Sequence, residues 1–376
     1  MNTKGSSFRS PRCNVFDLYV LKESILPFFF GFIVFTFVLL MDNIFKLIDY
    51  IVGKKIDFIY IFQLILYALP FIISMTIPMA VLVSVISSFG RLSSDSEIIA
   101  LKSFGVNPLR IILFPLIFSF LIFITMTIFS NFIVPEANYR MKKTLMIITR
   151  KNPSLNLREH IFNRIYDNYT IWAERIDQSK GELKNVQFIE KVRGKEKRII
   201  TSMKCNMKVS KDTLFLRFLS GEIHEIDENI PSKYRVLNFK VYIFKIPLPE
   251  ENSIRKVYRG KREMTIIHIL NELKKVKDKN MRWRYLIEIN KNFAIPFASI
   301  LFVLVGSGIG MGARIGGLSV GVTTSFFIFI IYYIFLVGGE ELAERGILNP
   351  NIGIWIPNLF LLIMGIIIYK REIYGK

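Results

Sequence analysis

The sequence predicts an α-helical membrane protein with six transmembrane helices and an extracytoplasmic β domain inserted between the third and fourth helices. The chain of 376 residues has a mean hydropathy of +0.39 and is 52% hydrophobic, yet 21% of its residues are charged. Apolar stretches long enough to cross a bilayer lie in two groups of three. Between the groups, short runs of alternating apolar and polar residues are typical of strands. We therefore expect an N-terminal transmembrane half (1–134), a β domain with a following helix (135–290) and a C-terminal transmembrane half (291–376).

The first three apolar stretches cover residues 24–49, 59–89 and 109–134. The first exceeds the apolar core of a signal peptide and is not followed by a small-residue cleavage site, so we expect it to be retained as a transmembrane helix. Pro70 and Pro78 are expected to kink the second helix.

The end of the first stretch carries charges. Asp42, Lys46 and Asp49 are spaced i, i+4 and i+7, which places them on one face of a helix. Charged residues at such a depth face the bundle interior, a cavity or the interface. Two interpretations stay open: a face that contacts a charged ligand, and an intrahelical ion set near the headgroups.

A short polar helix is predicted over residues 93–105, between the second and third stretches. Ser94 and Glu97 have the spacing of a capping box, and Asp95 lies in the first turn. Gly105, followed by Pro108, is expected to end the helix. The helix would be about ten residues long, or roughly 15 Å.

This helix also has an apolar stripe, formed by Ile98, Leu101 and Phe104. A capped helix with such a stripe suggests a docking surface for a cytoplasmic partner, and the alternative is a structured loop lying on the membrane interface. We favour the docking helix.

Alternating runs between the two groups predict an antiparallel sandwich or roll. The expected strands are 169–176, 185–191, 197–203, 213–219 and 235–246. A helix should follow, capped by Thr265, with Ile266, Ile269, Leu270 and Leu273 on one face. The four lysines after it, at positions 274, 275, 277 and 279, are interpreted as a solvated face.

The net charge is +20, and residues 135–290 hold 34 Lys and Arg against 19 Asp and Glu, an excess of 15. Such a domain could bind nucleic acid or anionic lipid, or could simply carry lysines on solvated faces. The topology decides against nucleic acid, because it places this domain outside the cytoplasm.

The last three stretches cover residues 293–309, 318–336 and 352–369, and Glu340, Glu341 and Glu344 are expected between the fifth and sixth. The short basic segments fall on one side of a six-span topology, including Arg314 between the fourth and fifth stretches. The positive-inside rule then puts both termini in the cytoplasm, and the long basic insert is no exception because long loops translocate largely regardless of charge.

The sequence gives little support to an enzyme. It contains no GxxxxGK[ST] segment, so no nucleotide site of that type is expected. The three histidines have no metal-ligand spacing, and the topology places Cys13 and Cys205 on opposite sides of the membrane. We expect no metal and no cofactor in this chain, and energy for any transport must come from a partner.

Several segments, in this order, resemble one family. They are Ser-Glu-Ile-Ile-Ala-Leu-Lys-Ser-Phe-Gly-Val at 96–106, Arg-Glu-Met-Thr at 262–265, Glu-Ile-Asn-Lys-Asn-Phe-Ala-Ile-Pro-Phe-Ala at 288–298, Arg-Ile-Gly-Gly at 314–317, Gly-Glu-Glu-Leu-Ala-Glu-Arg-Gly at 339–346 and Trp-Ile-Pro-Asn at 355–358. With the order of three spans, β domain and three spans, the chain resembles the LptF/LptG (YjgP/YjgQ) permeases of the lipopolysaccharide export ABC transporter.

The resemblance implies a non-catalytic permease subunit in the cell inner membrane. Its partners would be a second LptF/LptG-like subunit, a dimeric LptB-like ATPase that binds ATP and Mg, and LptC/LptA-like periplasmic proteins. The complex would extract lipopolysaccharide, or a related anionic glycolipid, from the outer leaflet and pass it to a periplasmic bridge. The β domain would be a periplasmic jellyroll. The runner-up is a non-transporting membrane scaffold that links a cytoplasmic partner to envelope proteins.

The resemblance also implies roles for particular residues. The ATPase contact would comprise Ser94, Asp95, Glu97, Ile98, Leu101, Phe104 and Gly105. The substrate contacts would be Lys46, Asp49, Lys54 and Lys55, of which Lys46 followed by Asp49 is closer to the LptG pattern than to that of LptF. From the predicted strands themselves we propose inward residues for the jellyroll lining, including Ile171, Phe188, Leu216 and Phe218, although alternate positions in these strands could equally face a closed core.

Overall fold

The computed structural model describes residues 15–51, 57–106, 108–151, 157–166, 168–177, 180–192, 195–210, 213–226, 234–247, 258–313 and 317–374. The chain divides into two compact units, of which the first comprises Met1–Met41, Ala68–Asn138 and Arg259–Lys376 and the second comprises Asp42–Tyr67 and Tyr139–Tyr258. Lys54, Lys55 and Arg314 lie outside the described residues.

Six helices in the described ranges are long and apolar enough to cross a membrane, as the sequence predicts. These spans are Leu18–Phe45, Phe58–Ser94, Leu109–Thr149, Lys279–Gly312, Leu318–Glu344 and Pro350–Arg371. They are built by α1 (Val15–Ile51), α2 (Phe58–Ser94), α4 (Pro108–Ile128), α5 (Val134–Lys151), α8 (Lys279–Ala313), α9 (Leu318–Glu344) and α11 (Ile356–Tyr374), with α10 (Pro350–Gly353) beginning the last. The chain is therefore a multi-pass membrane protein.

Several helices run past the ends of their apolar stretches. The third span was expected to end at residue 134, but a π-helical turn, η1 (Phe129–Ile133), joins α4 to α5, which continues to Lys151. The π turn lies just before Pro135, which has no backbone N–H and interrupts the helical hydrogen bonds. A π turn adjusts the helix locally at such an interruption. The prediction that Glu340, Glu341 and Glu344 lie in a connection is wrong, because α9 continues through Glu344. The chain turns only at Gly346, where φ is +79°.

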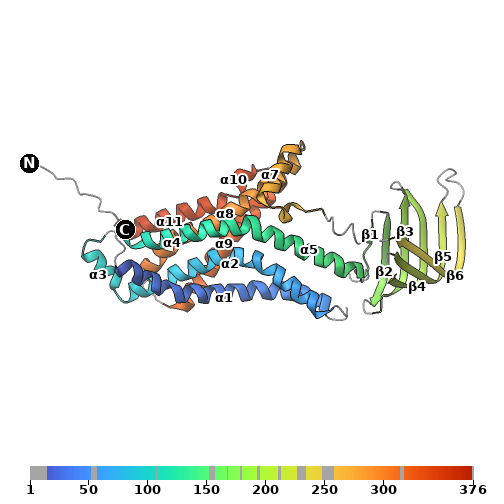
Figure 1. Cartoon of the computed structure of the whole chain (residues 1–376), viewed down its shortest axis with the longest axis horizontal. Coiled ribbons are helices and arrows are strands. Elements are labelled where there is room, and N and C mark those ends of the chain that lie inside the picture. The colour runs from blue at the N-terminus through green and yellow to red at the C-terminus, as the bar shows by residue number, and fades with distance from the viewer. Residues whose placement is uncertain are drawn as a thin grey trace, which may run out of the picture. The chain divides into compact units, whose positions relative to one another are not determined.

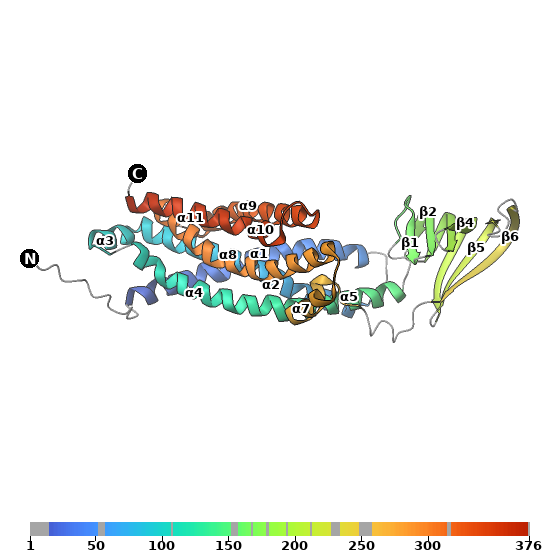
Figure 2. The same cartoon turned by 90° about the horizontal axis from the view of Figure 1, so that it is seen from above.

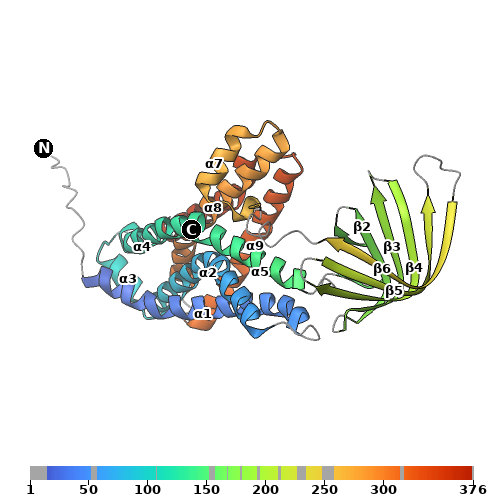
Figure 3. The ribbon, with the colours of Figure 1, turned by 45° about the vertical axis from the view of Figure 1, so that its right-hand side comes forward.

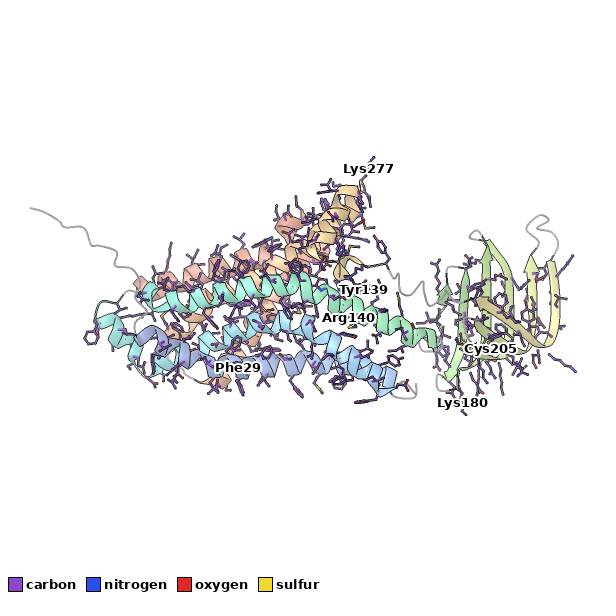
Figure 4. All side chains as sticks on the ribbon, in the orientation of Figure 1. Phe29, Tyr139, Arg140, Lys180, Cys205 and Lys277 are labelled. Carbon is purple, nitrogen blue, oxygen red and sulfur yellow. The ribbon has the colours of Figure 1, made fainter. Side chains whose placement is uncertain are left out.

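The centre of the helical unit is formed by α2 and α8. In each, 67% of the most apolar window is buried, against 17% in α1 and 22% in α9. Figures 1 and 2 show α8 running alongside α11 and α4. Apolar side chains of α1 such as Phe29, labelled in Figure 4, are exposed and suit a lipid environment.

The second unit contains a six-stranded antiparallel sheet in which every strand pairs with its neighbours in sequence. Its strands are β1 (Asn163–Tyr166), β2 (Tyr169–Asp177), β3 (Glu182–Val192), β4 (Lys195–Ser210), β5 (Thr213–Ile226) and β6 (Tyr234–Pro247). The five predicted strands correspond to β2–β6, and β1 was not predicted. An antiparallel β insert in a helical membrane protein is thus confirmed.

The sheet is rolled, as Figure 3 shows. Tyr169 of β2 and Phe244 of β6 have ring centroids 5.6 Å apart, although they lie four strands apart in the sheet. In a flat sheet four strand steps would separate them by about 19 Å. The roll encloses an apolar core on one face, into which Cys205 of β4 points (Figure 4).

Candidate functional site

The predicted polar helix exists but is shorter than expected. It is α3 (Glu97–Ser103), and Ser94 is not its cap but the last residue of α2. Ser96 takes the N-cap position with φ of 60° and makes no side-chain capping hydrogen bond. The capping-box prediction is wrong because α2 extends to Ser94, so this residue ends one helix and does not cap the next, which begins at Glu97.

The end of α3 follows the prediction. Gly105 has φ of +77°, its N–H donates to Lys102 O at 3.0 Å, and the N–H of Val106 donates to Leu101 O at 3.1 Å. This pair of bonds is a Schellman motif, for which glycine in the left-handed region is the preferred residue. Gly105 is therefore a structural stop for α3.

The apolar stripe of α3 divides between core and solvent. Ile98 is 2% exposed and Leu101 packs beside it, in a core cluster shared with α1, α2, α4, α8 and α11. Phe104 is 85% exposed and Ile99 is 44% exposed. The part of the stripe that is open to a partner is therefore Phe104, joined by Ile99 from outside the stripe, while Ile98 and Leu101 anchor the helix to the bundle.

Polar contacts also fasten α3 and its surroundings to other helices. The Tyr19 hydroxyl of α1 donates to Glu97 Oε1 at 3.0 Å, and Arg91 of α2 is paired with Glu23 of α1. Ser93 Oγ donates to the carbonyl of Met311 in α8 at 2.8 Å. Glu97 is thus partly engaged within the chain and holds α3 to α1, while the other two contacts hold the end of α2 to α1 and α8.

The structure does not describe the side chains of the predicted substrate contacts. Lys46 and Asp49 lie in α1, but their side chains are outside the described residues, as are Lys54 and Lys55 altogether. Asp42 is exposed on α1. Their roles stay predictions.

The four lining candidates of the sheet come together. Ile171, Phe188, Leu216 and Phe218 are each at most 1% exposed and share a single core with Leu214 and Ile246, among others. In this conformation all four face packed side chains, which agrees with the alternative of a closed core on the inner face of the roll.

A group of charged residues that sequence reasoning did not bring together lies in the helical unit. We call it the ion-pair cluster: Arg259, Lys261 and Arg262 before α7 (Ile266–Lys275), Glu136 of α5, Glu288 and Lys291 of α8, and Glu340 and Glu344 of α9. Figure 1 shows α7 at the end of the helical unit opposite α3. The cluster ties one short segment to three helices.

The distances define the pairing. Lys291 Nζ lies 2.9 Å and 3.0 Å from the two carboxylate oxygens of Glu340, and Arg262 lies 3.3 Å from both Glu288 and Glu340. Arg259 pairs with Glu136 at 2.8 Å, and Lys261 pairs with Glu344. These eight residues, four cations and four carboxylates, join α5, α8 and α9 to the segment before α7, so we interpret the cluster as part of the helix packing.

The environment of Arg262 is consistent with that role. Burial lowers the pKa of its guanidinium, but the charges of Glu288 and Glu340 outweigh burial and raise the pKa above its ordinary value. A cavity of about 140 Å³ adjoins the cluster, lined by residues of α2, η1, α5, α8 and α9. It is too small for a lipid with several acyl chains.

One signal in the sequence could have found this cluster. Glu288 and Glu340 lie next to long apolar stretches, and ionisable residues in such places are paired or functional by default. Their partners could not be identified, because Arg262, Glu288 and Glu340 meet only through the packing of separate helices. Among the described residues, no group of His, Cys, Asp or Glu is arranged to hold a metal ion.

Six apolar spans with a six-stranded antiparallel sheet inserted between the third and fourth define a multi-pass membrane protein with an inserted β domain. The family model described as "Lipopolysaccharide export system permease LptF/LptG" matches residues 18–371. The chain belongs to the LptF/LptG family, whose members are components of the lipopolysaccharide export system.

A relative from Rickettsia prowazekii (strain Madrid E), uncharacterized protein RP871, is 27% identical over 140 residues, which are 37% of this chain and 39% of that protein. The match thus spans well under half the length of this relative.

Proposed function

We propose that this chain is a permease subunit of an ABC transporter that extracts lipopolysaccharide, or a related anionic glycolipid, from the outer leaflet of the inner membrane and passes it to a periplasmic bridge. Family membership over residues 18–371 carries the proposal. In this proposal a second LptF/LptG-like subunit completes the permease, a dimeric LptB-like ATPase binds ATP and Mg, and LptC/LptA-like proteins receive the lipid. Both termini are cytoplasmic.

The geometry of α3 supports the coupling part of the proposal. A partner that contacts Phe104 and Ile99 acts on a helix held to the bundle by Ile98, Leu101 and the Tyr19–Glu97 hydrogen bond. Burying a side chain the size of Phe contributes about 1.5–3 kcal/mol to such a contact. The remaining predicted contacts, Ser94, Asp95 and Gly105, are exposed around it.

The rolled sheet supports the periplasmic part. We assign residues 135–290 to the periplasmic domain, between the transmembrane halves 1–134 and 291–376, and propose that the sheet is the β-jellyroll expected for the family. Its apolar inner face, including Ile171 and Phe218, is the surface that acyl chains would need, since each CH₂ left in water costs about 0.8 kcal/mol.

Site-directed photocrosslinking tests the proposed coupling. A photoreactive amino acid at Phe104, in cells that contain the native ATPase, should form a covalent adduct with that ATPase. The matched control is Ile347, another exposed apolar residue (66%), which follows α9 at the other end of the helical unit. An adduct at Phe104 and none at Ile347 supports the proposal. Equal labelling at both positions, or none at Phe104, contradicts it.

The alternative function, a scaffold without transport, predicts the same adduct but predicts that the chain moves no lipid. A Phe104→Asp variant that is inserted normally should stop the appearance of newly made lipopolysaccharide at the cell surface. Normal appearance with the variant as the sole copy would favour the scaffold.

A further inference from the structure

The sheet bends along a line that crosses its strands. Asn185 in β3 and Ser220 in β5 have φ of 49° and 52°, values in the left-handed region that non-glycine residues rarely adopt. At this line the buried positions change parity: Leu183 is buried on one side of Asn185, and Val186 and Phe188 are buried on the other. Such outliers in neighbouring parts of one sheet are costly and concentrate at functional sites.

A shallow, open groove of about 500 Å³ lies at the bend. It is lined by Trp172, Asn185, Val186, Gln187, Thr201, Ser202, Met203, Ser220, Gly221 and Glu222. Trp172, Gln187, Thr201 and Glu222 are paired in register across β2–β5. Their neighbours Ile171, Phe188, Ile200 and Ile223 are buried, so alternation places this row on the outward face of the sheet, the face opposite the core.

Gly221 belongs to the construction of this groove. A Cβ on Gly221 would lie 2.0 Å from the carbonyl oxygen of Thr201 on β4, so no larger residue fits without moving the strand. Because β4 and β5 approach so closely, no side chain fits at this position of the groove.

A row of three cations adjoins the groove. Arg175 pairs in register with Lys184, and Lys184 pairs with Lys204, on β2, β3 and β4. All three are exposed, and they point outward because Ile176, Leu183 and Cys205 beside them pack into the core. Within the described part of the chain, none of them forms an ion pair with a carboxylate. Like charges directly opposite each other on neighbouring strands are destabilising, and a bound anion would relieve this repulsion. The next outward row along β2 and β3 holds Asp177 and Glu182, whose carboxylates offset part of it.

Together, the groove and the row have the chemistry that recognises a charged sugar. The indole of Trp172 can pack on the C–H face of a pyranose, and Gln187 and Thr201 supply an amide and a hydroxyl for sugar hydroxyls. The cation row begins three residues from Trp172 along β2, about 10 Å away, so a saccharide that reaches both must extend along the strand. Arg175, Lys184 and Lys204 would then meet a phosphate or carboxylate on the saccharide.

We propose that the outward face of the sheet binds an anionic saccharide, with Trp172, Gln187 and Thr201 contacting the sugar and Arg175, Lys184 and Lys204 contacting its negative charge. The site lies on the face opposite the apolar core, so it does not depend on the proposed function. The saccharide is either soluble or the headgroup of a glycolipid, and the chemistry of recognition is the same for both.

Binding to the full chain in phosphatidylcholine nanodiscs tests the proposal. The soluble probe is fluorescently labelled trigalacturonate, followed by anisotropy, with neutral maltotriose as its comparison. The lipid probe is phosphatidylcholine vesicles that contain the anionic ganglioside GM1, followed by co-sedimentation and compared with vesicles that contain phosphatidylglycerol. Binding of trigalacturonate indicates a soluble saccharide, and binding of GM1 vesicles alone indicates a lipid headgroup. Either supports the proposal, and binding of neither overturns it.

Substitutions locate the site. Lys184→Glu with Lys204→Glu should weaken binding by at least about tenfold, the loss expected from one charge-assisted hydrogen bond. Trp172→Ala should weaken the saccharide probes and leave any binding of phosphatidylglycerol unchanged. Gln187→Ala gives a second test of the sugar contact if Trp172→Ala does not fold.

The matched control is Lys208→Glu, an exposed cation of β4 on the same face but away from the groove. Its effect should stay within about twofold, as expected for an exposed charge away from a binding site. An equal loss in Lys208→Glu, or unchanged saccharide binding in both Trp172→Ala and Gln187→Ala, overturns the proposal, because binding would then reflect net charge alone.

Discussion

Replacing Glu340 by Gln tests the ion-pair cluster directly. Glu340 receives hydrogen bonds from Lys291 at 2.9 Å and 3.0 Å, and the side chains of Glu340 and Lys291 are only 16% and 17% exposed. Breaking a buried pair costs about 3–5 kcal/mol because the remaining charge is left without its partner. Arg262, whose side chain is 62% exposed, adds little because solvent screens it. We expect Glu340→Gln to lower the free energy of unfolding by about 2–4 kcal/mol, which lowers the unfolding midpoint by roughly 5–15 °C.

The neighbouring residue provides the control. Glu341 pairs with Arg345 at 2.8 Å, but these side chains are 56% and 67% exposed. Glu341→Gln should therefore lower the free energy of unfolding by less than about 0.5 kcal/mol. Thermal unfolding of the purified protein in detergent can be followed by tryptophan emission, to which Trp355 contributes from the helical unit, where its indole donates to Asn290 at 2.9 Å. Equal midpoints for Glu340→Gln and Glu341→Gln would refute the view that the cluster stabilises the helix packing.

Three further predictions follow from glycine geometry and from one buried thiol. Gly339→Ala would place a Cβ 2.1 Å from the carbonyl oxygen of Gly353 and should lower the unfolding midpoint, whereas Gly338→Ala, with nothing within 4 Å, should not lower it. Gly105→Ala at φ of +77° should cost about 1 kcal/mol, measured by the same unfolding assay. Burial raises the pKa of the Cys205 thiol, so the native thiol stays protonated while the unfolded thiol ionises above about pH 8.5. The stability contributed by this group is therefore present below that pH and decreases as the pH rises further, and iodoacetamide at pH 9 should modify Cys205 only after unfolding, as mass spectrometry would show.

Most of the fold could be predicted from the sequence, because its signals are local. Long apolar stretches define the spans, and alternation with turn residues defines β2–β6. The strand β1 was missed because Asn163–Tyr166 is too short for its alternation to stand out. The helix bounds were misjudged at Val134 and beyond, because Pro135 suggests an end to the helix, whereas the π turn before it accommodates the proline and the polar residues that follow are good helix formers.

The candidate site was predicted only in part. Local signals identified α3 and its stop at Gly105, but not that Ile98 faces the bundle while Phe104 faces solvent, because the orientation of a short helix depends on its neighbours. The ion-pair cluster depends on residues far apart in the sequence. The bend at Asn185 and Ser220 was not predicted: Ser220-Gly221 is a turn signal and Asn tolerates the left-handed region, but neither shows that the strand continues beyond the residue.

ATP-dependent lipid release is the most direct test of the central claim that this chain is a permease subunit. The chain, its companion LptF/LptG-like subunit and the LptB-like ATPase would be reconstituted into liposomes that contain lipopolysaccharide, with a soluble periplasmic acceptor outside. ATP should transfer lipopolysaccharide to the acceptor, and Phe104→Asp should abolish the transfer while Ile347→Asp should not. Transfer that is independent of ATP, or equal in the two variants, would contradict the claim.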